Sequence, residues 1–162
     1  MTTTPRSVRD DVKNILDYLS DAELALFTNE VSLVGARVSF HRYDSRAAFL
    51  ISHEHPTLEQ YMNWTAAGDY SAVLLDGSLL QVTYDVSGGR VSGHRLAYIP
   101  CPYDLDRELL AAGYPIADVL ELHRDDTPAL RSPVRFDFDP ERAKKNHSAA
   151  HLTINGIDCR IA

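Results

Sequence analysis

The sequence predicts a single α+β domain: an antiparallel sheet, made of a meander plus C-terminal strands, with N-terminal helices and short helices packed on one side. Two observations lead to this class. Apolar residues recur at helical spacing near the N-terminus, and from Tyr70 onward alternating segments are separated by Asp-Gly and Gly-Gly pairs, which are typical of β-hairpin turns. With 162 residues the chain can bury a core unaided, and we expect one domain over residues 1–162.

The first helix is expected over residues 7–19, where the apolar positions follow a helical period. Thr4 stands in the N-cap position and Pro5 in the first helical position. The capping-box sequence over residues 20–23 predicts a short second helix that runs through Phe27.

The next segments change from extended chain to helix. We expect extended chain over residues 31–43 and a short buried strand over 47–51. Residues 53–55 read His-Glu-His, and imidazoles two apart on a strand can chelate one metal ion. A proline follows directly, so we expect a loop there instead, before a helix that begins in residues 57–60 and ends at Gly68.

The middle of the chain predicts a three-stranded meander. The strands cover residues 70–75, 79–86 and 90–99, and the turns fall at residues 76–77 and 87–89. These Gly-containing pairs supply the positive φ angles that tight hairpin turns need. We therefore expect three consecutive antiparallel strands.

Between the meander and the last strands, the sequence predicts mostly helix and loop. Prolines on both sides of Cys101 remove backbone donors and end the pairing, and Asp104 is the expected cap of a short helix through Leu110. Residues 116–122 fit either a helix or a strand, and residues 125–133 are rich in turn-forming residues and predict a loop.

The last part of the chain predicts three strands, over residues 134–138, 151–155 and 157–161, with a loop at 140–148. In the first of them the apolar residues alternate with Arg135, Asp137 and the following Asp139.

These polar residues converge if the first two C-terminal strands pair with their apolar sides aligned and turned inward. His151 then projects on the same side as Arg135, Asp137 and Asp139. A slip of one residue in the register would turn a whole strand over and disperse the polar groups.

The candidate catalytic residues are therefore Arg135, Asp137, Asp139, His147 and His151. Two chemistries remain open for them. The carboxylates and imidazoles could hold a divalent metal ion as cofactor, although their spacing matches no specific metal motif. Alternatively, the two histidines exchange protons in metal-free chemistry on a phosphodiester while Arg135 stabilises negative charge. A third reading is purely structural, with the arginine paired to a carboxylate on a solvated sheet face.

Composition excludes several classes of protein. Sixteen lysines and arginines stand against 23 aspartates and glutamates, and a net charge of −7 disfavours coating a nucleic-acid backbone. No apolar run approaches the ~20 residues that span a membrane, and two isolated cysteines favour a cytoplasmic location. Motors, classical dehydrogenases, α/β-hydrolases and zincins have no motif support.

Several segments resemble the bacterial domain-of-unknown-function family 2290, and together they span most of the chain. They are residues 70–78, residues 94–98 with Pro100-Cys-Pro102, residues 135–140, and His151-Leu with Cys159-Arg-Ile161. Members of that family tend to carry a second histidine two places after the one that matches His151, where this chain has Thr153. The resemblance therefore implies a weakened paired-histidine site, and it implies no activity.

A looser likeness links the Asp-Gly-Ser hairpin, the Arg-Phe-Asp strand and the late histidines to TumE-type toxins. It implies a small bacterial effector that acts on RNA or nucleotides in a phage-defence or toxin–antitoxin setting. We therefore carry two functional hypotheses: a small phosphodiester-processing or nucleotide-acting enzyme, and a non-catalytic protein-binding subunit of a larger bacterial complex.

Overall fold

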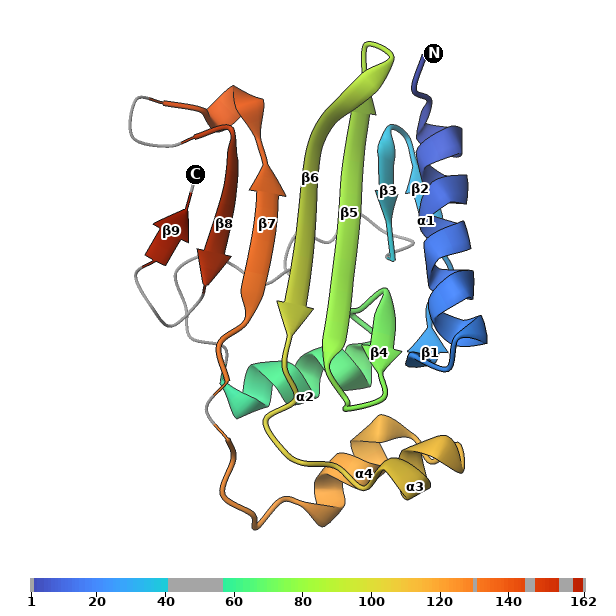
Figure 1. Cartoon of the computed structure of the whole chain (residues 1–162), viewed down its shortest axis with the longest axis vertical. Coiled ribbons are helices and arrows are strands. Elements are labelled where there is room, and N and C mark those ends of the chain that lie inside the picture. The colour runs from blue at the N-terminus through green and yellow to red at the C-terminus, as the bar shows by residue number, and fades with distance from the viewer. Residues whose placement is uncertain (1, 41–56, 130, 145–147, 155–158, 162) are drawn as a thin grey trace.

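A computed structural model describes residues 2–40, 57–129, 131–144, 148–154 and 159–161. The strand expected at 47–51, the His-Glu-His segment at 53–55 and His147 lie outside the described residues. The rest confirms the α+β class: one antiparallel sheet of nine strands within the described ranges, accompanied by helices (Figure 1).

Seven of the strands follow one another across the sheet in the order β1, β4, β5, β6, β7, β8, β9. Their bounds are β1 Ala25–Thr28, β4 Ala72–Leu74, β5 Leu79–Ser87, β6 Arg90–Ile99, β7 Val134–Phe138, β8 Ala150–Ile154 and β9 Cys159–Ile161. The predicted meander is confirmed as β4, β5 and β6. The two late strands pair as β7 with β8, which is the condition on which the convergence of their polar residues depended.

One edge of β5 is shared by two neighbours. β4 pairs with it at Leu79 and Leu80, whereas β3 (Arg37–Ser39), the second strand of a hairpin with β2 (Ser32–Val34), pairs with it at Tyr84 and Asp85. Between the two, the Val82 amide donates to a side chain, the Ser71 hydroxyl, at 3.0 Å.

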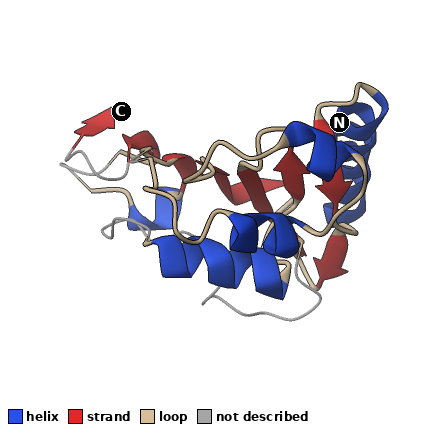
Figure 2. Cartoon of the chain, turned by 90° about the horizontal axis from the view of Figure 1, so that it is seen from below, coloured by secondary structure: helices blue, strands red, loops and turns tan. Residues whose placement is uncertain are grey.

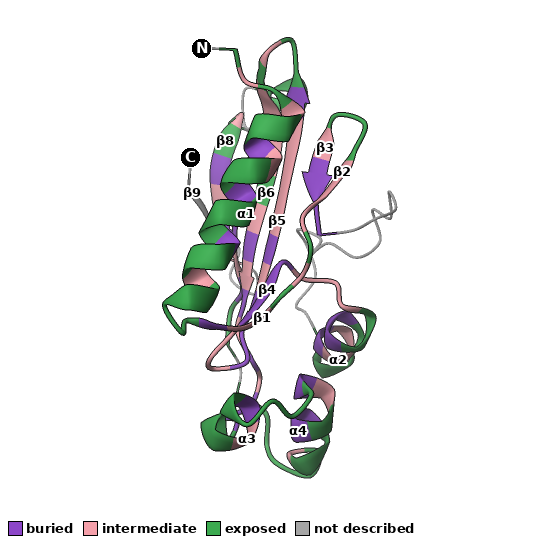
Figure 3. Cartoon of the chain, turned by 90° about the vertical axis from the view of Figure 1, so that its right-hand side faces the viewer, coloured by how far each residue is buried: buried purple, intermediate pink, exposed green. Residues whose placement is uncertain are grey.

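The helices lie on both faces of the sheet (Figures 2 and 3), so the expectation that they pack on one side is wrong. Helix α1 (Pro5–Asp21) packs on one face, and α2 (Leu58–Ala67), α3 (Arg107–Ala111) and α4 (Ile116–Leu122) lie on the other. Within the described ranges, none of these helices has the length and apolar character needed to cross a membrane.

The alternation of β5 explains why the core has two parts. Leu79 joins a cluster with Tyr61 and Trp64 of α2, whereas Leu80 and Val82 point to the other face and join the cluster under α1. Helix α1 contributes a stripe of three buried residues to that second cluster, namely Val8, Val12 and Leu16.

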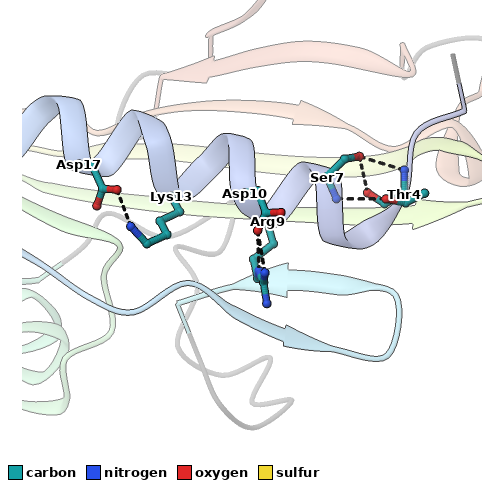
Figure 4. Close-up of polar contacts among 6 residues, drawn as sticks. All are labelled: Thr4, Ser7, Arg9, Asp10, Lys13 and Asp17. Carbon is teal, nitrogen blue, oxygen red and sulfur yellow. Dashed lines mark hydrogen bonds and ion pairs between the residues drawn. The ribbon is translucent and has the colours of Figure 1, made fainter.

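Both predicted helix starts are confirmed by their caps. The Thr4 hydroxyl accepts from the Ser7 amide at 3.1 Å and the Ser7 side chain accepts from the Thr4 amide at 3.1 Å (Figure 4). Thr57 and Gln60 form the same reciprocal pair at the start of α2, which ends at Gly68 in the left-handed conformation.

The predicted helix from Ser20 through Phe27 is wrong. Helix α1 continues through Ser20 to Asp21, Glu23 takes a positive φ of 54°, and the chain then enters β1. Pairing with β4 satisfies the backbone of β1 and buries Ala25, which a one-turn helix at this edge would not do.

Two further details differ from the sequence-based expectation. The cap of α3 is Asp106, whose carboxylate accepts from the amide of Glu108 at 2.8 Å, whereas Asp104 forms an ion pair with Arg131. The ambiguous segment 116–122 is helix α4, because Ile116, Val119 and Leu120 pack into the core at the i, i+3, i+4 spacing of a helix.

The turn between β4 and β5 predicts a test of the fold. Gly77 has φ +79°, and a Cβ there would lie 2.7 Å from Leu105 Cδ1 and 3.1 Å from Cys101 Sγ. Gly77→Ala should lower the free energy of unfolding by about 2–3 kcal/mol, the sum of left-handed strain and overpacking. Urea denaturation measures this.

Gly35→Ala is the matched control. Gly35 also has a positive φ, of 61°, but nothing lies within 4 Å of an added Cβ. This variant should lose only about 1 kcal/mol, the cost of the backbone strain. Equal losses in the two variants would contradict the packing described for the turn.

Candidate functional site

Asp137 on β7 lies at the centre of a polar group that three strands bring together. The register pairs it with Arg95 on β6 and with His151 on β8. Arg135, two residues earlier on β7, pairs with Thr153. Because residues paired across strands and residues two apart share a face, all five side chains lie on one side of the sheet.

The Asp137 carboxylate contacts three groups that can carry positive charge. Its Oδ2 accepts from Arg135 Nε at 2.6 Å and lies 3.4 Å from His151 Nε2. Its Oδ1 lies 3.8 Å from Arg95 Nε. The sequence-based prediction that Arg135, Asp137 and His151 share a face is therefore matched by the geometry.

The polar side of these strands is the buried one, so the expectation that Leu152 and Ile154 point inward is wrong. Arg135, Asp137 and His151 are only 5–7% exposed, whereas Phe136 on the opposite face is 49% exposed. The physical reason lies in β6: Ala97, which pairs with Arg135, belongs to the core cluster on the α2 side. The polar residues of β7 and β8 continue that buried side.

Two buried oxygens in this group have no hydrogen-bond partner among the described residues: Asp137 Oδ1 and Thr153 Oγ1. An unsatisfied buried polar atom costs about 1–3 kcal/mol and calls for an explanation such as a water, an ion or a catalytic role. The two oxygens belong to neighbouring strands on the same face. They mark the position where a ligand atom could be received.

Both ring nitrogens of His151 already face oxygen atoms. Nδ1 lies 3.2 Å from the Ser148 carbonyl oxygen, and Nε2 lies 3.4 Å from Asp137 Oδ2. A hydrogen on either nitrogen therefore has an acceptor in the protein. This arrangement suits a residue that orients Asp137 better than one that exchanges protons with a substrate.

Asp139 lies outside this group in its described contacts. It caps the short 3₁₀ helix η2 (Pro140–Arg142): its carboxylate accepts from the Arg142 amide at 3.2 Å and lies 3.4 Å from Arg142 Nε. The strand ends at Phe138, so the alternation that placed Asp139 beside Asp137 no longer applies. His147 cannot be placed, and among the described residues no three histidine, cysteine, aspartate or glutamate side chains gather as a metal site.

Sequence reasoning missed Arg95 and Thr153. Arg95 could have been found from the two hairpin turns, which fix the alternation of β6, once β7 is known to pair with β6. Thr153 lies two residues after His151 and shares its face by alternation, but its burial beside Arg135 gave no signal in the sequence.

His94 lies next to this group in the sequence but on the opposite face. Its ring stands between those of Tyr84 and Phe138, with centroid separations of 5.7 Å on each side. Burial lowers the pKa of His94 below its usual value of 6.5, and the negative charge of Asp137 and the backbone of Phe136 oppose this only in part.

A family model described as "Uncharacterized conserved protein (DUF2290)" matches residues 21–162. Neither the search of curated proteins nor the search of solved structures returned a match.

The buried ion pair predicts a large effect on stability. Asp137→Asn leaves the buried Arg135 guanidinium without its carboxylate and should lower the free energy of unfolding by roughly 3–5 kcal/mol. Asp85→Asn removes a pair of similar geometry, with Arg37 at 2.8 Å, but that pair is more than one-third exposed and should cost no more than about 1 kcal/mol. Denaturant midpoints of the two variants, measured side by side, compare them; a similar loss would contradict the assigned burial.

The lowered pKa of His94 predicts a pH dependence. Between the folded and unfolded pKa values the unfolded chain binds the proton more readily, so stability falls as the pH drops from 7 through this range. His94→Phe removes that titration and should give a shallower loss of stability between about pH 7 and pH 5. Thermal unfolding at a series of pH values tests this, and parallel curves for the two proteins would refute it.

Proposed function

The chain belongs to the DUF2290 family, and from its own residues we propose that the group around Asp137 binds and hydrolyses a phosphodiester or a nucleotide. The observation that carries the proposal is the buried carboxylate with one oxygen held and the other without a hydrogen bond in the described part of the chain.

Asp137 is the proposed general base. Arg135 and His151 hold its Oδ2, which fixes the direction of Oδ1. A general base must lie within hydrogen-bonding reach of the proton that it accepts, and a fixed, otherwise unbonded carboxylate oxygen meets that need for a water molecule. Arg135 and His151 are then positioning residues that act through Asp137.

Arg95 is the proposed contact for the phosphoryl group. Its side chain is 44% exposed while the carboxylate of Asp137 beside it is buried, so a ligand that arrives from the solvent can contact Arg95 next to the site. A guanidinium matches phosphate oxygens with two parallel hydrogen bonds and is well suited to negative charge that develops there. The 3.8 Å separation from Asp137 Oδ1 is longer than a hydrogen bond and leaves the donors of Arg95 available to such a ligand.

The proposed reaction adds water across one P–O ester bond. Asp137 accepts a proton from the attacking water, whose oxygen bonds to phosphorus while the P–O bond to the leaving group breaks; in a nucleoside triphosphate this is an anhydride bond. The leaving oxygen takes a proton from the solvent. A divalent ion would find one ligand in Asp137 Oδ1, so the metal remains a variable of the assay.

The test measures hydrolysis of labelled single-stranded RNA, DNA and a nucleoside triphosphate, each with Mg²⁺, with Mn²⁺ and with a chelator. Asp137→Asn should lower the turnover by about 10²-fold or more, which is typical for the loss of a general base. Arg95→Gln changes an exposed residue, so the fold should remain intact, and it should raise KM as well as lower turnover.

Arg90→Gln is the matched control, since Arg90 is exposed at the start of the same strand and outside the site. It should leave any activity unchanged. An activity that all three variants share with the wild type, or no activity on any of the substrates, would refute the assignment.

The second candidate function is a non-catalytic protein-binding subunit of a larger bacterial complex. It is favoured by Phe136 of β7, a large apolar side chain that is 49% exposed on the face opposite the charged group. Either function would fit a cytoplasmic effector of defence or of a toxin–antitoxin pair. Expression of the wild type and of Arg95→Gln in a bacterial host tests that role, because Arg95→Gln should keep the fold and a catalytic toxin should then arrest growth less strongly.

A further inference from the structure

The sheet has an open apolar face over β6, β7 and β8, on the side that carries α1. In Figure 1, α1 covers the strands at the right, and no described helix lies over these three strands on that side. We define the open apolar face by six of the residues that alternate toward this side: Leu96, Val134, Phe136, Phe138, Leu152 and Ile154. His94, Tyr98 and Ala150 alternate toward the same side.

The exposure of this face is unusual for an antiparallel sheet. Phe136 is 49% exposed, its neighbours are half-buried, and none of the six belongs to either core cluster of the described residues. Antiparallel sheets with one solvated face normally place polar residues on it. Here Arg135, Asp137 and His151 are buried on the other side of the sheet, whereas the open apolar face is mostly apolar, with His94 at its edge, so it has the character of an interface.

Helix α1 packs on β5, the strand next to the open apolar face. Figure 4 shows Arg9, Lys13 and Asp17 on the flank of α1 that lies toward the β2–β3 hairpin. Because a helix turns about 100° per residue, Ile15 and Tyr18 fall on the opposite flank, toward β6. They are 59% and 67% exposed, which is unusual for large apolar side chains beside a sheet.

We propose that this surface is the docking site of an amphipathic helix with a basic outer face, supplied by a partner protein. Three strands are about 14 Å wide and five residues of strand are about 17 Å long, an area that one helix of about 11 residues covers. Helix α1 already packs on the same side of the sheet, so a second helix beside it would complete one layer.

Charge decides between a partner and a second copy. The chain has a net charge of −7, so a second copy brings like charge, whereas a basic helix is attracted. Helical spacing also places Asp11 on the same flank of α1 as Ile15 and Tyr18, where a lysine or arginine of the bound helix would meet it. This gives a partner chemistry to the binding-subunit candidate and is independent of the chemistry at Asp137.

The experiment uses a designed peptide of roughly 18 residues, five helical turns, with leucines on one face and lysines on the other. A second peptide carries glutamates in place of the lysines. Fluorescence anisotropy measures binding to the full chain, and hydrogen exchange locates the protected segments. We expect the lysine peptide to bind at least tenfold more tightly than the glutamate peptide and to protect β6, β7 and β8.

Two variants on different elements test the docking site, and a third variant is the matched control. Phe136→Ser on β7 and Ile15→Ser on α1 should each weaken binding of the lysine peptide at least fivefold. Leu122→Ser, at a residue that is 70% exposed on α4 and far from this face, should not. Circular dichroism confirms that each variant is folded, which is expected because all three side chains are largely exposed.

Three outcomes would overturn the proposal. Equal binding of the two peptides would show that charge does not select the occupant. If Leu122→Ser weakened peptide binding as much as the other two variants, the peptide would be binding without a defined docking site. A wild-type dimer in sedimentation that Phe136→Ser converts to a monomer would assign the face to a second copy of the chain.

Discussion

The buried ion pair between Arg135 and Asp137 is the interaction on which the β6–β8 half of the structure depends. Two charges with under a tenth of their surface exposed are tolerable only when they face each other. Since side chains alternate along a strand, turning this pair toward the core turns Phe136 and its neighbours toward the solvent. The candidate site and the open apolar face are therefore two consequences of a single strand orientation.

Most of the fold could be predicted because its signals are local. The turn residues around Gly77 and Gly88 and the caps at Thr4 and Thr57 act within a few residues, and the structure agrees with each. The segment after Ser20 shows the limit. Its local sequence favours a helix start, but partners nearly fifty residues away in β4 draw the backbone into a strand.

The candidate site was predictable in part of its membership and not in its orientation. Alternation was enough to place Arg135, Asp137 and His151 together, because an antiparallel register keeps one face in common. Which face is buried depends on where the helices pack, and a charged side normally predicts solvent. Arg95 belongs to the site only because β7 pairs with β6. Which strands pair is a long-range property that local sequence patterns do not reveal.

The divided edge of β5 has a consequence for how the molecule opens. Its neighbours β3 and β4 pair with separate ends of the strand. Between them the Val82 amide donates to the Ser71 hydroxyl instead of to a backbone carbonyl of a neighbouring strand. Helix α1 packs on β1, β2, β3 and β5, and so bridges the gap between β3 and β4 along the edge of β5. The β2–β3 hairpin can therefore separate from β5 only when its packing against α1 is also lost, and fraying that begins there can stop at Ser71 while β4 to β8 stay intact.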